Sequence, residues 1–101
     1  MRNDKNNLIV DLSFRFALEI IEFTELLEQN RKFIISRQLL KAGTSIGANI
    51  REAQNAESKD DFVHKFKVAA KEADECEYWL LLCKYSKGYP DTDLLLNKLV
   101  N

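Results

Sequence analysis

The sequence has little glycine, proline and cysteine, and it has no long apolar run. Three glycines and one proline in 101 residues leave few turns for a many-stranded sheet. Two cysteines do not make a disulfide framework. The longest apolar run, Trp79–Cys83, has five residues, whereas a membrane-spanning helix needs about 20. No signal peptide is recognisable at the start, so we expect a cytoplasmic protein with no membrane partner.

The sequence also has no large excess of positive or negative charge. The chain has 15 basic and 16 acidic residues and a net charge of −1, far from the excess that drives unspecific phosphate binding. It is 46% hydrophobic and 31% charged, a composition typical of a folded globular protein. Its length suits one domain over residues 1–101.

Helical spacing of apolar residues is the strongest positive signal, and it begins near the N-terminus. It predicts a first helix over residues 11–29, with acidic residues opposite a wide apolar face. Two rows form that face, with Phe14, Leu18 and Ile21 in the first and Phe16, Ile20, Phe23 and Leu27 in the second.

A second helix is predicted over residues 33–56, against local propensity. Gly43 and Gly47 each cost a helix about 1 kcal/mol relative to alanine. An apolar period of alternating four and three residues continues through them for some twenty residues and should outweigh that cost. Its members are Ile35, Leu39, Ala42, Ile46, Asn49, Ala53 and Ala56.

Two further helices follow. Ser58 with the acids after it is typical of a helix start, and Gly88 and Pro90 of a helix stop, which predicts a helix over 59–86. A shorter one is predicted over 91–100, capped by Asp91 or Thr92. The short connection between the second and third helices makes them antiparallel neighbours. The fold class is therefore all-α: an antiparallel up-down four-helix bundle with a short or truncated fourth helix.

Small residues and charge predict how the second and third helices meet. Counting outward from their turn places Gly43 and Gly47 opposite the third-helix residues Ala69 and Ala73, so close helix packing is expected there. The second helix is basic and the third acidic, which predicts ion pairs from Arg37 and Lys41 to third-helix glutamates. Asn49 occupies a core position and needs a hydrogen-bond partner; a structural role and a ligand or subunit contact both remain open.

No catalytic, metal-binding or cofactor-binding set emerges. The segment Gly43–Gly47 lacks the lysine and the preceding strand of a phosphate-binding loop. The single histidine, His64, has no glutamate three residues before it, as a di-iron bundle requires. Cys76 and Cys83 are about 10.5 Å apart along one helix, too far for a disulfide. We therefore expect no enzyme, no cofactor and buried thiols.

Two sets of residues are candidates for contact with partners. Apolar side chains outside the main row of the third helix predict an oligomer interface, formed by Tyr78, Trp79, Leu82 and Tyr85. Basic residues in and before the second helix are the alternative, a nucleic-acid contact, formed by Arg31, Lys32, Arg37, Lys41 and Arg51.

Three stretches together carry a family resemblance. They are Ser13–Ala17 (SFRFA), Ser36–Ala53 (SRQLLKAGTSIGANIREA) and Ser58–Phe62 (SKDDF), the last followed by Lys71–Ala73 and Glu77–Leu80. The chain resembles the bacterial four-helix-bundle proteins encoded in intervening sequences of 23S ribosomal RNA genes, to which accessory proteins of diversity-generating retroelements are related. The resemblance covers about residues 8–90.

The resemblance implies a homopentameric ring with no known catalysis. Retroelement relatives are basic and associate with a reverse transcriptase and nucleic acid, whereas this chain is nearly neutral. We therefore expect a self-associating scaffold or accessory subunit. A nucleic-acid-binding accessory protein is the alternative.

Overall fold

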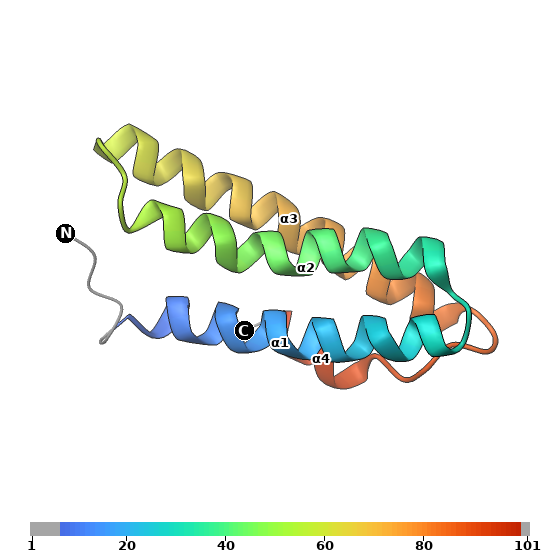
Figure 1. Cartoon of the computed structure of the whole chain (residues 1–101). Helices are drawn as coiled ribbons and strands as arrows, with labels where there is room; N and C mark the ends of the chain where they lie inside the picture. Colours follow the sequence, from blue (N-terminus) through green and yellow to red (C-terminus); the bar gives the residue numbers. More distant parts are fainter. Residues whose placement is uncertain (1–6, 100–101) are drawn as a thin grey trace.

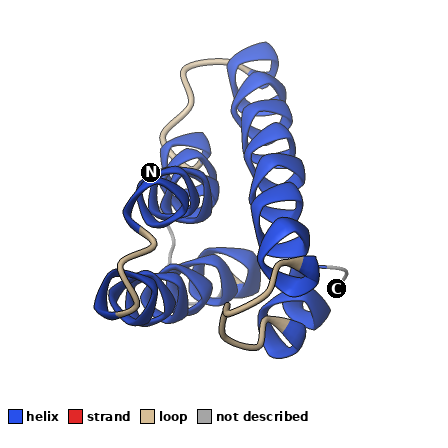
Figure 2. Cartoon of the chain, turned by 90° about the vertical axis from the view of Figure 1, so that its right-hand side faces the viewer, coloured by secondary structure: helices blue, strands red, loops and turns tan. Residues whose placement is uncertain are grey.

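The computed structural model describes residues 7–99, and four helices account for most of them (Figure 1). They are α1 (Leu8–Gln29), α2 (Phe33–Ala53), α3 (Lys59–Tyr85) and α4 (Asp93–Leu99). Short loops join them, and no strand occurs within residues 7–99 (Figure 2). The predicted all-α fold class is confirmed.

Capping residues set two of the helix starts. The Asn7 side chain accepts a hydrogen bond from the Val10 amide at 3.3 Å, so α1 begins three residues before its predicted start. Asn7 also donates to the Gln54 side chain at 2.7 Å, which ties the start of α1 to the end of α2. Ser58 caps α3 as predicted, by accepting from the Asp61 amide at 3.0 Å.

The glycine- and serine-bearing middle of the sequence is helical, as predicted. The polar side chains there do not open the backbone, because their hydroxyls bond to carbonyls within the same helix. Thr44 donates to the Leu40 carbonyl at 2.7 Å and Ser45 to the Lys41 carbonyl at 2.6 Å. The helix ends at Ala53 rather than residue 56, because Gln54 and Asn55 form turn-like hydrogen bonds to Arg51 and Glu52.

Helix α2 lies at the centre of the molecule. It packs on α1 on one side and on α3 on the other, and successive helices run in opposite directions (Figure 1). No Cα atom of α1 lies within 8 Å of one in α3, so these two helices do not pack directly on each other. One core joins the elements. Its large, fully buried side chains are Ile20, Leu27, Leu39 and Leu80.

The glycines of α2 face α1, so the prediction that they pack against Ala69 and Ala73 of α3 is wrong. A Cβ built on Gly43 would lie 2.7 Å from Ile20 Cγ1, and one on Gly47 would lie 3.2 Å from the Ser13 carbonyl oxygen. Helix α2 has small residues on two of its sides. The glycine positions alone therefore do not show which neighbouring helix packs against them. Ala69 is buried in the core, and Ala73 is half-buried beside it.

The predicted ion pairs between α2 and α3 are also wrong. Within residues 7–99, Arg37 and Lys41 make no ion pair, and both are exposed. The α2–α3 ion pair that does form joins Lys65 Nζ to Glu52 Oε1 at 2.8 Å, near the turn between the helices. Arg37 and Lys41 lie on the side of α2 away from its buried row, so they do not reach the acids of α3.

Helix α4 begins at Asp93, two residues later than predicted, and spans seven residues. Thr92 is buried, and its hydroxyl donates to the Leu80 carbonyl at 3.4 Å, which holds the start of α4 against α3. The prediction for Val100 lies outside the described residues.

The contact at Gly43 predicts a stability test. Gly43→Ala should lower the free energy of unfolding by about 1–2 kcal/mol, because overpacking against fully buried Ile20 exceeds the gain of about 1 kcal/mol in helix propensity. Urea denaturation measures the change.

The control is the same substitution in an Ile20→Ala background, which removes the three Ile20 atoms that a Cβ would meet. There Gly43→Ala should be neutral or stabilising by up to about 1 kcal/mol. Equal destabilisation in both backgrounds would mean that Ile20 does not limit the approach.

Candidate interaction surfaces

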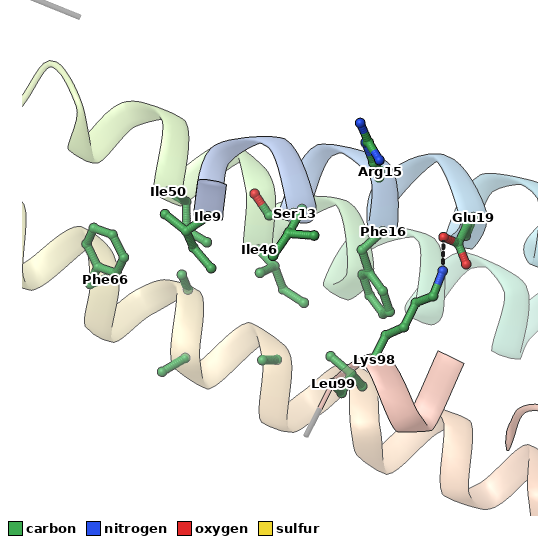
Figure 3. Close-up of a pocket in the computed structure, with 14 residues that line it drawn as sticks. Ile9, Ser13, Arg15, Phe16, Glu19, Ile46, Ile50, Phe66, Lys98 and Leu99 are labelled. Atoms are coloured by element: carbon green, nitrogen blue, oxygen red, sulfur yellow. Dashed lines mark hydrogen bonds and ion pairs between the residues drawn. The ribbon is translucent and has the colours of Figure 1, made fainter. Parts of the chain in front are cut away.

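An apolar groove runs between α1 and α3, whose backbones stay more than 8 Å apart between Cα atoms (Figure 3). We call it the inner groove; its volume is about 580 Å³. Its floor is formed by Ile46 and Ile50 of α2. Its walls and far end are formed by Ile9, Leu12, Ser13, Arg15, Phe16 and Glu19 of α1, Phe66, Ala69, Ala70 and Ala73 of α3, and Lys98 and Leu99 of α4.

The polar groups at the inner groove already have partners. Glu19 accepts a hydrogen bond and ion pair from Lys98, which joins α1 to α4 (Figure 3). Arg15 pairs with Asp11 at 3.1 Å, and the Ser13 hydroxyl donates to the Val10 carbonyl at 3.1 Å. The groove therefore offers apolar area with no nucleophile–base pair and suits an apolar helix or ligand rather than a reaction.

A second apolar surface lies on the other side of α1. Phe14, Leu18 and Ile21 are 53%, 46% and 39% exposed, although the sequence predicted them as part of the buried face. Leu40 of α2, also exposed, is three residues from Gly43 and so lies on the edge of α2 that faces α1. We call these four residues the outer ridge. Helical spacing showed that both rows of α1 are apolar but not which row faces the core.

The predicted oligomer interface on α3 divides into exposed and half-buried residues. Tyr78 and Tyr85 are 58% and 79% exposed, and Leu82 is exposed beside them; we call these three the aromatic patch. Trp79 instead packs against the core, and its Nε1 is buried without a hydrogen-bond acceptor. Its ring meets that of Tyr78 edge-on at 5.6 Å. Trp79 therefore contacts the patch through Tyr78 and packs against the core.

The five predicted nucleic-acid residues form a row rather than a compact patch. Arg31 lies in the turn before α2 with a positive φ of 64°, and the Lys32 amino group lies 4.7 Å from the centre of the Tyr89 ring. Arg37 and Lys41 are exposed one turn apart on α2. Arg51 lies near the far end of α2 and takes part in another interaction.

Asn49 is not the buried amide that the sequence predicted. It is half-buried, and its side chain donates to the Ser45 carbonyl of the same helix at 2.8 Å. The row of alternating four- and three-residue steps averages slightly less than a helical turn per step, so members seven residues apart turn progressively around the helix. Asn49 lies at the edge of the buried side, whereas Ala53 stays buried. This hydrogen bond satisfies the Asn49 amide without a ligand or a second subunit.

A charged hollow of about 480 Å³ lies at the α2–α3 turn. It holds the Lys65–Glu52 pair, and the hydrogen bond from Lys65 to Glu52 raises the pKa of Lys65. Its charges are of both signs, which gives an ion no preference. Across residues 7–99 no group of three histidine, cysteine, aspartate or glutamate side chains is placed to hold a metal. None of the described helices is long and apolar enough to cross a membrane.

The two cysteines are buried free thiols, as predicted. Burial raises the pKa of Cys76 from 9.0 to about 12, with a smaller contribution from Glu75, and burial raises that of Cys83 to about 11. A reactive cysteine needs a lowered pKa and solvent access. These thiols therefore have a packing role.

The fold and its surfaces define a class: a small helical bundle with uncovered apolar faces and, in its described part, no clustered metal ligands. The chain belongs to the 23S rRNA-intervening sequence protein family, whose model matches residues 5–99. The family resemblance seen in the sequence is confirmed.

One solved structure is similar to this chain over nearly its whole length. It is a protein of unknown function from the S23 ribosomal protein family of Bacteroides thetaiotaomicron, 40% identical, with a TM-score of 0.87. The match covers 92% of this chain and 89% of that one. A comparison with curated proteins gives no match. These findings fix the family and the fold; the family is not a known enzyme family.

The raised thiol pKa values predict a pH dependence. Below about pH 9 the thiols are protonated in both states, so they cause no change in the free energy of unfolding. Between about pH 9 and pH 12 the unfolded chain loses thiol protons that the folded chain keeps, so the free energy of unfolding should fall as pH rises. Urea denaturation across this range measures the slope.

The matched control is Cys76→Ala/Cys83→Ala, in which the alkaline slope should be shallower. At pH 8, labelling of the native protein by a thiol-specific disulfide reagent should be at least about 100-fold slower than in concentrated urea. Rapid native labelling would contradict the burial of both thiols.

Proposed function

We propose that this protein is a non-enzymatic helical subunit that associates with copies of itself, as a scaffold or accessory subunit. The observation that carries the proposal is the uncovered apolar area on separate faces of one short chain. The inner groove, the outer ridge and the aromatic patch lie on different sides of the helices and all reach solvent. Monomeric soluble proteins rarely expose several such surfaces, and partners commonly cover them.

The chemistry of the side chains in residues 7–99 supports the same proposal. The polar groups of the inner groove are paired, the thiols are buried with raised pKa values, and the charged hollow holds a compensated ion pair. Aromatic residues at an exposed patch are enriched in protein–protein contacts. A homopentamer, which the family resemblance implies, is the stoichiometry that we propose.

Self-association predicts a mass several times 11.7 kDa by light scattering at tens of micromolar protein, and five times that mass for the pentamer. If the aromatic patch contributes, Tyr78→Ser/Leu82→Ser should lower the mass, because both side chains are exposed and their loss leaves the core intact. Leu8→Ser is the control, since Leu8 is exposed at the start of α1, which Asn7 ties to Gln54 near the opposite end of α3 from the patch. A strictly monomeric wild-type protein would contradict the proposal.

Nucleic-acid binding is a second candidate, and one observation favours it. Arg37 and Lys41 are exposed on α2 and make no ion pair within residues 7–99, so their charges are available to phosphates. The net charge of −1 limits the affinity that this row alone supplies.

This candidate predicts salt-dependent binding to a double-stranded RNA oligonucleotide. Arg37→Gln/Lys41→Gln should reduce the slope of log affinity against log salt by about 2, because each lost phosphate contact contributes about 0.9 to a duplex slope. Lys87→Gln, an exposed lysine in the α3–α4 loop, is the control. Absence of binding at low salt would exclude this function.

A further inference from the structure

The outer ridge lies on a face that α1 and α2, which run side by side, form together (Figure 1). On α1, Phe16 lines the inner groove, and the ridge residue Leu18 is two positions farther along, which is about 200° around a helix. The ridge therefore faces away from the groove and from α4. It is uncovered among residues 7–99 whatever occupies the inner groove.

Two contacts fix which residues of α1 and α2 lie at the same level. The Ser36 hydroxyl donates to the Thr24 carbonyl at 3.1 Å, near the turn between the helices. Farther from the turn, Gly47 lies against the backbone of Ser13. Because the helices are antiparallel with a rise of about 1.5 Å per residue, the level of any other residue follows by counting from these contacts.

Opposite charges border the ridge on its two helices. Glu22 and Glu25 are exposed on α1, four and seven residues after Leu18 and so on the same side of the helix; we call them the acidic edge. Arg37 and Lys41 are exposed beside the ridge on α2 and form the basic edge. Counting places Arg37 level with Glu25, and Lys41 with Glu22, to within one helical turn. None of the four makes an ion pair in the described part of the chain.

Other charged groups do not change this layout. Those on or next to the face are Asp11, Arg15, Glu28, Arg31, Lys32 and Arg51. Asp11 and Arg15 pair with each other at 3.1 Å. The Glu28 carboxylate accepts a hydrogen bond from Ser36 at 3.4 Å, and Arg51 takes part in another interaction. The two turn residues lie beyond the end of the ridge. The face is thus acidic on α1 and basic on α2.

A face with this layout is complementary to itself. A two-fold axis parallel to the helices lays α1 of each copy along α2 of the other, with equal levels opposed. Glu25 then meets Arg37 of the second copy, and each such pairing occurs twice, as in any isologous contact. An axis across the helices instead lays α2 along α2, whose one acid, Glu52, pairs with Lys65. Charge therefore selects the parallel axis.

Side-chain size favours the same arrangement. The exposed ring of Phe14 is level with the small residues Thr44 and Ala48 of α2, so in the pair it lies over small residues of the second copy. The Thr44 hydroxyl already donates to the Leu40 carbonyl at 2.7 Å, so an apolar contact leaves it satisfied. Ile21 is level with Leu40, and these two apolar side chains meet across the axis.

We propose that two copies pair through the outer ridge about a two-fold axis parallel to α1 and α2. This inference rests on the proposed self-association and specifies one contact of it. The contact is isologous, so it joins copies two at a time, whereas a ring joins one surface to a different one. It pairs two single copies or two whole assemblies, and the aromatic patch on α3 lies outside it.

Charge reversal at exposed positions tests the pairing. Glu22→Lys/Glu25→Lys makes both edges basic, and Arg37→Glu/Lys41→Glu makes both acidic, so each variant repels its own kind. At about 10 mM ionic strength, where surface charges are little screened, and at hundreds of micromolar protein, the wild-type mass by light scattering should be twice that of either variant. An equimolar mixture of the two should regain the wild-type mass, because every edge again faces the opposite charge. Circular dichroism melts confirm that both variants fold.

Lys67→Glu/Lys71→Glu is the matched control. It gives the same net charge as Arg37→Glu/Lys41→Glu, at exposed positions four residues apart on α3, away from the ridge. It should keep the wild-type mass, and in a mixture it should not raise the mass of Glu22→Lys/Glu25→Lys. If it does, net charge rather than the ridge drives association, and the proposal is wrong.

The remaining outcomes separate this inference from the proposed function. If the wild-type protein assembles and both variants keep its mass, self-association stands and ridge pairing is wrong. If the variants fall below half of the wild-type mass, or their mixture does not regain it, the ridge belongs to a contact of another symmetry and two-fold pairing is wrong. A monomeric wild-type protein would contradict both proposals.

Discussion

The architecture depends on the close approach of α2 to α1, which two missing side chains allow. Gly43 lies against fully buried Ile20, and Gly47 lies against the backbone of Ser13. Ser36 of α2 adds a hydrogen bond to the Thr24 carbonyl at 3.1 Å. These contacts commit the small-residue edge of α2 to α1. The other buried side of α2, which carries Ala42 and Ala53, packs on α3. Helix α2 therefore separates α1 from α3, the two longest helices.

That separation explains the uncovered apolar area. A helix that spans seven residues closes the space between α1 and α3 at one end only, and an apolar groove remains along the rest. On the far side of α1 the outer ridge stays exposed because α2 meets α1 along the other row. Residues 7–99 do not cover these apolar surfaces, and this is the observation on which the proposed self-association rests.

Much of this fold could be predicted from the sequence, because its helices have long apolar periods. The period through Gly43 and Gly47 outweighed poor local propensity, and the Ser58 cap placed the start of α3 correctly. Relations between helices were harder to predict. Both rows of α1 are apolar, so the pattern could not show that Phe14 and its neighbours face solvent. The glycines could serve either neighbour of α2, and opposite net charges on α2 and α3 did not show that Arg37 and Lys41 point away from the acids.

The same distinction applies to the candidate site. Helical spacing identified Tyr78, Leu82 and Tyr85 as outside the core. The inner groove could not be identified in this way, because it depends on how three helices are arranged and on where α4 ends between them.

The central claim is that one chain leaves apolar faces which other copies cover. Small-angle X-ray scattering over a concentration series tests it most directly, because the Cα radius of gyration of one chain is 14.3 Å. If copies cover these faces, the radius of gyration rises well above this value and levels off at high concentration. A value that stays near that of one chain at every concentration would contradict it.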